Sequence, residues 1–542
     1  MSVKAIPRRS FKIPFIPASL EYLGKGVSGT YGRHRRYVVL LELGNTPKSR
    51  IRRLREKGGS VVLRCLRKTT EVIRITWNST TGEEGAASRR GKWQDKESVG
   101  KRKERRFLFS AVALVLLLGV RFPAWGLAGI ETVPQSPLFH AASLPDEPLI
   151  SAERHAELYR RMKEQFYSPW RQDAPRQASE TLQWVFDRYG KGGIYGENLQ
   201  PRPASWVDEQ RGQARLDAVG ELNARCVSVR PTSLRLMPTE TPVFLSPDLP
   251  GEGYPFDYLQ NSLVHPGEPL FASHLSLDGL WAWCDTSYAS GWVSISDLAF
   301  VDEADIQRWR SMPLAAITRE HAILRDGTTS LFRAKIGTLL PLARRGIAVH
   351  TLIAPARGGD GRLSERLVRV AADEASPMPL SPTPWTLAAI AEECLGELYG
   401  WGGFLGNRDC SAMTRDILLP FGIWLPRNSR FQGETGKVVP LDGLSGEEKK
   451  ELIRSGGVPF LTLIGMPGHV MLYVGTRRGE PVVLHNLWGI RTERKGKEGR
   501  FVVGESVLTT LDLGSDLPDH APGRLLIDRI HRMALPADEG VQ

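Results

Sequence analysis

Residues 407–412 read Asn-Arg-Asp-Cys-Ser-Ala and lead into an apolar run of helical spacing that ends at Pro420. Cys410 therefore lies at or near a helix start, where free backbone N–H groups and the helix dipole favour negative charge. The thiolate is the reactive form of cysteine, and this placement predicts a lowered thiol pKa. Most buried cysteines only fill a core. Polar neighbours on both sides, Asp409 and Ser411, favour a nucleophile instead.

Two segments come immediately before this stretch. Trp385–Leu398 has apolar residues at three- and four-residue steps, which predicts a helix. Cys394 lies on its apolar stripe, so we interpret it as a packing residue. Residues 399–403 read Tyr-Gly-Trp-Gly-Gly, and two adjacent glycines predict a flexible turn between the helix and Cys410.

A thiol nucleophile needs a base, and two histidines further along the chain offer one. His469 stands at the head of an apolar strand after a Pro-Gly turn, and His485 lies in the next strand, Val482–Asn486. The two strands of one hairpin can bring both imidazoles together. In a Cys–His–X triad the third group holds the other ring nitrogen of the base and fixes its tautomer. One histidine in an apolar strand is usually a core residue, but two in one hairpin favour a triad.

These segments together resemble the NlpC/P60 family of papain-like cysteine peptidases. The resemblance is carried by Tyr-Gly-Trp-Gly-Gly at 399–403, Asp-Cys-Ser at 409–411, Gly-His-Val at 468–470 and His485. It implies cleavage of γ-D-glutamyl bonds to diamino acids in the stem peptides of peptidoglycan, and no metal or organic cofactor. The 16-residue step from His469 to His485 is longer than the family usually has.

One subgroup of this family resembles the chain over about 135 to 535. In that subgroup the peptidase follows a helical stabilising segment and two bacterial SH3-like domains. The stretches that carry this likeness are 162–170, 254–262, 420–429 and 486–491. The resemblance implies an α+β multidomain fold, with a papain-like catalytic domain preceded by two small SH3-like β-barrels and a helical segment.

The resemblance also assigns roles to residues. Cys410 is the expected nucleophile, His469 the base and His485 the group that orients it. Residues expected to lie near the oxyanion or to contact substrate are Tyr399, Trp401, Asp409, Ser411, Ser429, Asp257 and Tyr258. Asp409 is the candidate for binding a free amino end of the peptide. Asp257 and Tyr258 belong to the first SH3-like domain, which in related enzymes closes one end of the groove.

Two other functions remain open on sequence grounds. One is a wall-binding protein whose SH3-like domains carry the function and whose peptidase fold is inert. The other keeps the Cys–His chemistry but makes the protein an amidase or acyltransferase. The five cysteines are too few and too scattered for a disulfide framework, and no CxxC or Cys/His metal spacing occurs.

The charge of the chain is unevenly distributed. The net charge is +12, but residues 1–106 hold 27 Lys and Arg against 9 Asp and Glu, so the rest carries −6. A basic total often indicates a nucleic-acid partner. Since the basic residues are confined to the N-terminal part, we expect no nucleic-acid partner for the remainder.

The charge step coincides with an export signal. A basic hexamer, Lys101–Arg106, leads into the apolar run Phe107–Val120, and small residues follow up to Gly129. This pattern is typical of a signal peptide or membrane anchor at 107–129, although a buried helix is the alternative. The run is short for a membrane span, which needs about 20 apolar residues. We therefore expect export to the periplasm or cell envelope, with any membrane contact made through this segment alone.

The remaining domain boundaries follow from changes in pattern. Residues 1–106 lack sustained periodicity and are expected to be a disordered or untranslated extension. Amphipathic helices predict a helical stabilising segment at 130–225. Short β-prone pieces separated by turn residues predict the first barrel at 226–303 and the second at 304–375. The peptidase domain is expected at 376–542, and a proline-rich linker is expected at its start, at 376–384.

Overall fold

The computed structural model describes residues 38–45, 60–64, 71–78, 127–521 and 523–539. The chain divides into two compact units, Met1–Val120 and Arg121–Gln542. The predicted signal or anchor segment lies outside the described residues up to position 126. Of the helices described, none has the length and apolar character needed to cross a membrane.

The described part of the first unit is a small antiparallel sheet with the strand order β1-β3-β2. Its strands are β1 (Val38–Asn45), β2 (Ser60–Arg64) and β3 (Glu71–Asn78). The sequence analysis predicted no regular structure here, so these strands are a difference from expectation. Their sequences are short and rich in Val, which favours strands, and turn residues flank them, as at Gly58-Gly59 before β2 and at Asn45-Thr46-Pro47 at the end of β1. These local signals were present and were not used in the prediction.

The second unit begins with helices that cover the later domains. They are α2 (Ala128–Glu131), α3 (Pro137–Ala141), α4 (Ala152–Phe166), α5 (Ser179–Leu182), α6 (Trp184–Tyr189) and α7 (Ala204–Gln213). Ser151 caps α4 by accepting a hydrogen bond from Arg154 N, as expected for a serine at this position. The buried residues of α4, Leu158, Met162 and Phe166, have the helical spacing that the sequence predicted.

A seven-stranded antiparallel sheet follows, with the order β10-β4-β7-β8-β9-β5-β6. Its strands are β4 (Ala224–Ser228), β5 (Thr232–Arg235), β6 (Gln260–Val264), β7 (Pro269–Leu275), β8 (Trp281–Asp285), β9 (Ser290–Ser294) and β10 (Leu298–Phe300). Buried tryptophans 281, 283 and 292 pack against α6 and α7 on one side. We call this the first β-domain.

The second β-domain follows α8 (Glu303–Ser311). It has a five-stranded sheet in the order β16-β15-β14-β11-β17 and a separate hairpin, β12-β13. The strands are β11 (Leu314–Ile317), β12 (Ala322–Asp326), β13 (Thr329–Ala334), β14 (Leu339–Arg344), β15 (Val349–Arg357), β16 (Leu363–Ala371) and β17 (Ala375–Pro377). The linker predicted at 376–384 therefore begins as an edge strand of this domain.

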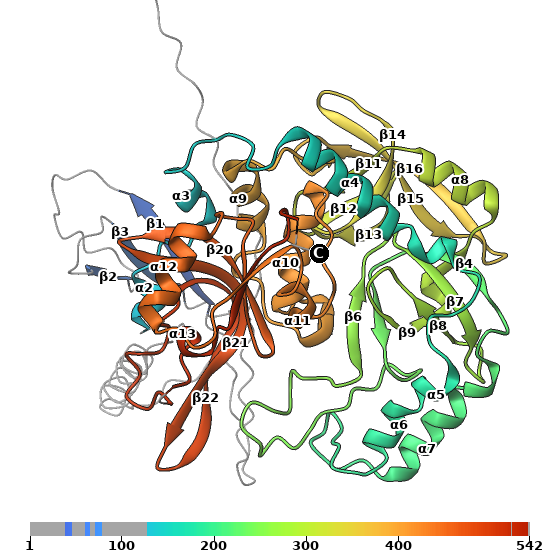
Figure 1. The fold of residues 1–542 in the computed structure, drawn as a ribbon, viewed down its shortest axis with the longest axis horizontal. Helices are drawn as coiled ribbons and strands as arrows, with labels where there is room; N and C mark the ends of the chain where they lie inside the picture. Colours follow the sequence, from blue (N-terminus) through green and yellow to red (C-terminus); the bar gives the residue numbers. More distant parts are fainter. Residues whose placement is uncertain (1–37, 46–59, 65–70, 79–126, 522, 540–542) are drawn as a thin grey trace, which may run out of the picture. The chain divides into compact units, whose positions relative to one another are not determined.

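The C-terminal domain is built on a six-stranded antiparallel sheet in the order β18-β23-β19-β20-β21-β22 (Figure 1). The strands are β18 (Lys437–Pro440), β19 (Leu463–Met466), β20 (His469–Arg477), β21 (Glu480–Arg494), β22 (Lys497–Thr510) and β23 (Arg532–Leu535). The helices are α9 (Pro384–Glu393), α10 (Cys410–Leu418), α11 (Ser429–Gln432), α12 (Gly446–Gly456) and α13 (Leu526–Arg529).

Helices cover both faces of this sheet. Alternate residues of β20 point to opposite faces, as in any strand. Val470, Leu472 and Val474 join the core formed with α9 and α10. Met471 and Tyr473 join the second core, formed with α12 and α13. The central strands are buried on both faces, which explains their nearly continuous apolar sequence.

A two-residue turn joins β20 to β21. Arg478 and Gly479 both have positive φ, at 51° and 84°, and such turns match the twist of the flanking strands. Because the turn has only two residues, the long sequence separation between His469 and His485 is accommodated by the length of β20 and β21.

Candidate active site

The helix start predicted around Cys410 is present. Asp409 is the N-cap of α10, its Oδ1 accepting a hydrogen bond from Ala412 N at 2.9 Å, and Cys410 is the first helical residue. α10 lies against β20 and β21. The backbone N–H of Val470 donates to the Cys410 sulfur, so the thiol meets β20 at the residue after His469.

The sequence-based prediction of a lowered Cys410 pKa is wrong. Burial, and after it the negative Asp409 carboxylate, raise the pKa of this thiol to about 12. The hydrogen bonds from Val470 and Ser411 and the Arg427 charge act in the opposite direction but are weaker. Removing a thiolate from water outweighs a helix start. The unliganded enzyme therefore holds a neutral thiol, which must give up its proton when it attacks.

The two histidines of the hairpin contact each other directly. Nε2 of His469 lies 2.8 Å from Nδ1 of His485. Nε2 of His485 in turn lies 3.1 Å from the Thr509 hydroxyl on β22. His485 and Thr509 are fully buried, and His469 is 8% exposed. The sequence prediction that the hairpin brings both imidazoles together is confirmed.

Both imidazoles are neutral. Burial, followed by the positive charge of Arg529, lowers the pKa of His469 to about 4. Burial and then His469 hold the pKa of His485 well below its ordinary value. Among the described residues no hydrogen bond joins the Cys410 sulfur to the His469 ring. Catalytic hydrogen bonds are often long in unliganded enzymes and shorten when substrate binds.

A buried guanidinium holds the Cys-flanking residues in place. Arg427 donates to both Asp409 oxygens, at 3.0 and 2.7 Å, and to Ser411 Oγ at 2.8 Å. Burial alone would raise the Asp409 pKa, but Arg427 and backbone N–H donors hold it below its usual value. Arg427 also donates to Ser262 of β6 at 2.9 Å. The catalytic helix start is therefore tied to the first β-domain.

The Tyr-Gly-Trp-Gly-Gly segment is held against the same strand. Gly402 and Gly403 have φ of 61° and 93°, and a Cβ at Gly402 would lie 2.0 Å from the carbonyl oxygen of Gln260. Only glycine fits such a close approach at these angles. The turn that the sequence suggested to be flexible is packed directly on β6.

Aromatic rings cluster around Tyr399. Tyr399 is half-buried, and burial, then the nearby Cys410 and Asp409, raise its pKa. Phe256 of the first β-domain contacts the rings of Tyr399, Trp401 and Trp488 at centroid distances of 6.0, 5.5 and 5.4 Å. Trp401 is 37% exposed. These rings form an aromatic contact between the first β-domain and the C-terminal domain.

The two candidates from the first β-domain have different positions. Tyr258 is half-buried beside Trp401, and its hydroxyl donates to Glu252 at 2.7 Å. Asp257 is fully buried, bonded to Arg235 and to the backbone N–H groups of Val243 and Leu259. Asp257 therefore stabilises its own domain and does not line a groove, which corrects the sequence assignment.

Ser429 is the first residue of α11, a short helix that packs against β19 and β20. It is half-buried. It therefore lies close to the strand that begins at His469, as a pocket-lining residue would.

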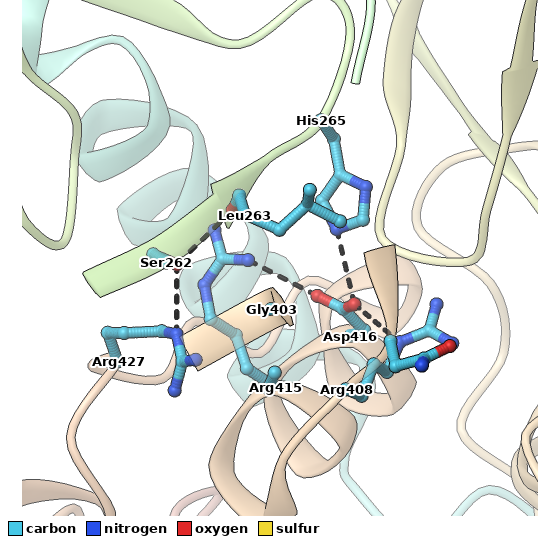
Figure 2. Close-up of a pocket in the computed structure, with 10 residues that line it drawn as sticks. Ser262, Leu263, His265, Gly403, Arg408, Arg415, Asp416 and Arg427 are labelled. Carbon is cyan, nitrogen blue, oxygen red and sulfur yellow. Dashed lines mark hydrogen bonds and ion pairs between the residues drawn. The ribbon is translucent and has the colours of Figure 1, made fainter. Parts of the chain in front are cut away.

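One cluster has the composition of a metal site. Ligand atoms of Glu320, His321 and Glu397 lie within 4.8 Å of one another. However, Lys335 Nζ lies 3.1 Å from Glu397, and Arg408 lies 2.6 Å from Glu320. These two cations already neutralise the carboxylates, so we interpret the cluster as structural. The small cavity beside it, of about 10 Å³, is lined by His265, Arg415 and Asp416 and is too small for a substrate (Figure 2).

Four residues of the site were not found from the sequence. Arg427 stands in a stretch that carried the family likeness, but its bond to a residue 18 positions away leaves no local signal. Thr509 and Arg529 lie in segments without motifs. Glu252 lies in a loop of the first β-domain, where an acidic residue is unremarkable.

A buried cysteine at a helix start and a His–His pair on adjacent strands define a hydrolase of the cysteine-nucleophile class. Residues 396–495 match the NlpC/P60 family, residues 107–218 the N-terminal stabilising domain of NLPC_P60 proteins, and residues 242–294 the SH3 domain of the SH3b1 type. The C-terminal domain is an NlpC/P60 domain, preceded by a stabilising domain and one SH3-like domain, as the sequence resemblance indicated. The second SH3-like domain, expected at 304–375, stays a prediction. This match supports a cysteine peptidase of the peptidoglycan-hydrolase kind in general.

One solved structure shares the fold. An NlpC/P60 endopeptidase from Photobacterium damselae subsp. piscicida is 24% identical, with a TM-score of 0.69, and the alignment covers 75% of this chain and 98% of that one. An NlpC/P60 family protein from Bacillus cereus ATCC 10987 is 16% identical with a TM-score of 0.39, covering 58% and 100%. A search of curated proteins found no match.

Proposed function

We propose that this chain is a γ-D-glutamyl-diamino acid endopeptidase that cleaves the stem peptides of peptidoglycan. The observation that carries the proposal is the hydrogen-bonded His469–His485 pair next to the strand position that contacts the Cys410 sulfur. Such a pair supplies a base whose outer nitrogen is held, which is what a thiol nucleophile needs.

In the proposed reaction, Cys410 Sγ attacks the γ-glutamyl carbonyl while the thiol proton passes to His469. Backbone N–H groups at the start of α10, with Tyr399 nearby, stabilise the oxyanion. The C–N bond then breaks, and His469 returns the proton to the departing amine. Water, deprotonated by the same imidazole, attacks the thioester and releases the γ-glutamyl carboxylate and the thiol. Every proton is returned, and no cofactor takes part.

Substrate contacts follow from the positions of the other groups. Asp409 is the negative group proposed for a free amino end, since it retains its charge beside Arg427. Tyr258 and Trp401 are proposed to line the same end of the groove, and Ser411 and Ser429 its floor. This arrangement favours short peptides with a free N-terminus. Export through the segment at 107–129 would bring the enzyme to such peptides.

The test is product analysis with the full-length protein and L-Ala-γ-D-Glu-meso-diaminopimelate. We expect mass spectrometry to find L-Ala-D-Glu and diaminopimelate. The variant Cys410→Ala should be inactive, whereas Cys394→Ala, at a second buried cysteine, should keep its activity. Release of L-Ala would place the cut at the Ala–Glu bond and contradict the proposed bond specificity, and wall binding without turnover would indicate an inert binding protein.

A further inference from the structure

Thr509 ends the chain of hydrogen bonds that begins at His469. It lies on β22, opposite Val483 in the antiparallel ladder, and its hydroxyl is 3.1 Å from His485 Nε2. Thr509 and His485 both have no exposed surface. The hydroxyl is therefore the partner on which the outer nitrogen of His485 depends.

The order of the bonds fixes where each proton must be. Nε2 of His469 faces His485, so Nδ1 is the nitrogen left to receive the thiol proton. A neutral His469 with a free Nδ1 carries its hydrogen on Nε2 and donates it to Nδ1 of His485. His485 must then carry its own hydrogen on Nε2, and this N–H needs an acceptor. The Thr509 oxygen provides it.

The reversed order would inactivate the base. If His485 carried its hydrogen on Nδ1, it would donate to Nε2 of His469. His469 would then hold its hydrogen on Nδ1 and could not accept a proton from Cys410. The Thr509 hydroxyl can pair with either order, since it can accept from an Nε2–H or donate to a bare Nε2. Without it the productive order leaves a buried N–H unpaired, which is less tolerated than the unpaired acceptor nitrogen of the reversed order, so its loss favours the reversed order.

We propose that Thr509 is a positioning residue whose hydroxyl accepts from the Nε2–H of His485, and so stabilises the pair of tautomers in which His469 can act as the base. The role rests on the proposed thiol chemistry, but the tautomer can be observed without turnover. Threonine suits this position because its hydroxyl accepts a hydrogen bond without adding charge to a buried site.

The experiment compares Thr509→Val, Thr509→Ser and the control Thr510→Val in the full-length protein. Valine keeps the shape and removes the hydroxyl, serine restores the hydroxyl, and Thr510 is the neighbouring threonine on the opposite face of β22. Ring ¹⁵N NMR reports the tautomer of each histidine, with the His485 signals assigned by their loss in His485→Gln.

Thr509→Val should move the His485 signals from the Nε2–H toward the Nδ1–H form and lower kcat by roughly tenfold to a hundredfold, with KM little changed. Thr509→Ser should restore both, and Thr510→Val should change neither. Unchanged tautomers in a folded Thr509→Val would overturn the inference even if the wild type is active. A tautomer shift in a protein without wild-type peptidase activity would count against the proposed function alone.

Discussion

Two clusters of polar side chains lie close together in the sequence, one containing Cys410 and the other Arg408. Burial affects the pKa values of their ionisable groups differently. The first is the catalytic relay, Cys410, His469, His485 and Thr509, in which burial keeps thiol and imidazoles neutral. The second is an ionic hub around Arg408, in which nearby cations hold the pKa values of Asp416 and Glu397 below their usual range, although burial raises that of Glu320. The difference lies in the partners, because burial favours neutral groups unless an opposite charge is close.

The hub joins three domains. Arg408 contacts Asp416 at 2.7 Å, Glu320 of the second β-domain at 2.6 Å, and Glu397. His265 of the first β-domain reaches Asp416 at 3.2 Å (Figure 2). Burial acts to raise the Asp416 pKa, but His265 and Arg408 hold it well below its usual range. The hub is thus a structural connection, and the relay is the part able to move protons.

The largest effect is expected from removing the base. His469→Ala should lower kcat by about 10³-fold or more, since general acid–base catalysis contributes roughly 10²–10⁴-fold. The measurement is hydrolysis of the same tripeptide. His274→Gln, at a buried histidine of the first β-domain, is the control and should remain active. Near-normal turnover by His469→Ala would show that His469 is not the catalytic base.

Breaking the hub should affect stability instead. Arg408→Met leaves three buried carboxylates without their shared guanidinium, and breaking such pairs costs about 3–5 kcal/mol. The check is the free energy of unfolding in urea. The control Arg308→Met breaks a more exposed pair with Glu365, for which the loss should be below about 1 kcal/mol. Equal losses in both variants would mean that the hub is no stronger than a surface pair.

The pH dependence of kcat/KM should follow the neutral imidazole. His469 acts as a base only when unprotonated, and its pKa is about 4, so activity should be retained down to that pH and fall below it. Arg529→Gln removes a charge that lowers this pKa, and the acid limb should therefore move to higher pH. Initial rates, with folding checked by circular dichroism at each pH, provide the measurement. A shift of the limb to lower pH would contradict the assigned role of Arg529.

The smallest effect is expected at the groove. Tyr258→Phe removes the hydroxyl that donates to Glu252 at 2.7 Å. Such a hydrogen bond contributes about 0.5–1.5 kcal/mol. Because it holds the Tyr258 ring in the position proposed for substrate contact, its loss should raise KM by at most the corresponding factor of roughly two to ten. kcat should change little, since Tyr258 lies away from the thiol in the proposed arrangement. Steady-state kinetics with the tripeptide separate the two constants, and a fall in kcat alone would contradict this placement.

The sequence predicted what local patterns encode. The helix start at Cys410, the hairpin with His469 and His485, and the order of the domains were all readable because each depends on neighbouring residues. The thiol pKa was not, since it depends on burial under a sheet formed 60 residues later. Asp257 shows the same limit, because its partner Arg235 comes from another strand.

Long-range partners were missed for the same reason. Arg427 and Thr509 form hydrogen bonds to residues 18 and 24 positions away, and such distant bonds leave no periodic or compositional pattern in the sequence. The three strands of the N-terminal unit were missed although turn residues flank them, because the basic composition of the segment was given more weight than its short apolar runs.

The central claim is that the Cys410 sulfur forms the covalent intermediate. Acid quenching of the full-length enzyme during turnover of L-Ala-γ-D-Glu-meso-diaminopimelate, followed by intact-mass analysis and peptide mapping, tests it directly. We expect an L-Ala-γ-D-glutamyl adduct on the peptide that contains Cys410. The adduct should be absent from the Cys410→Ala variant and present in the Cys394→Ala variant. Turnover with the adduct on another residue, or hydrolysis by Cys410→Ala, would contradict it.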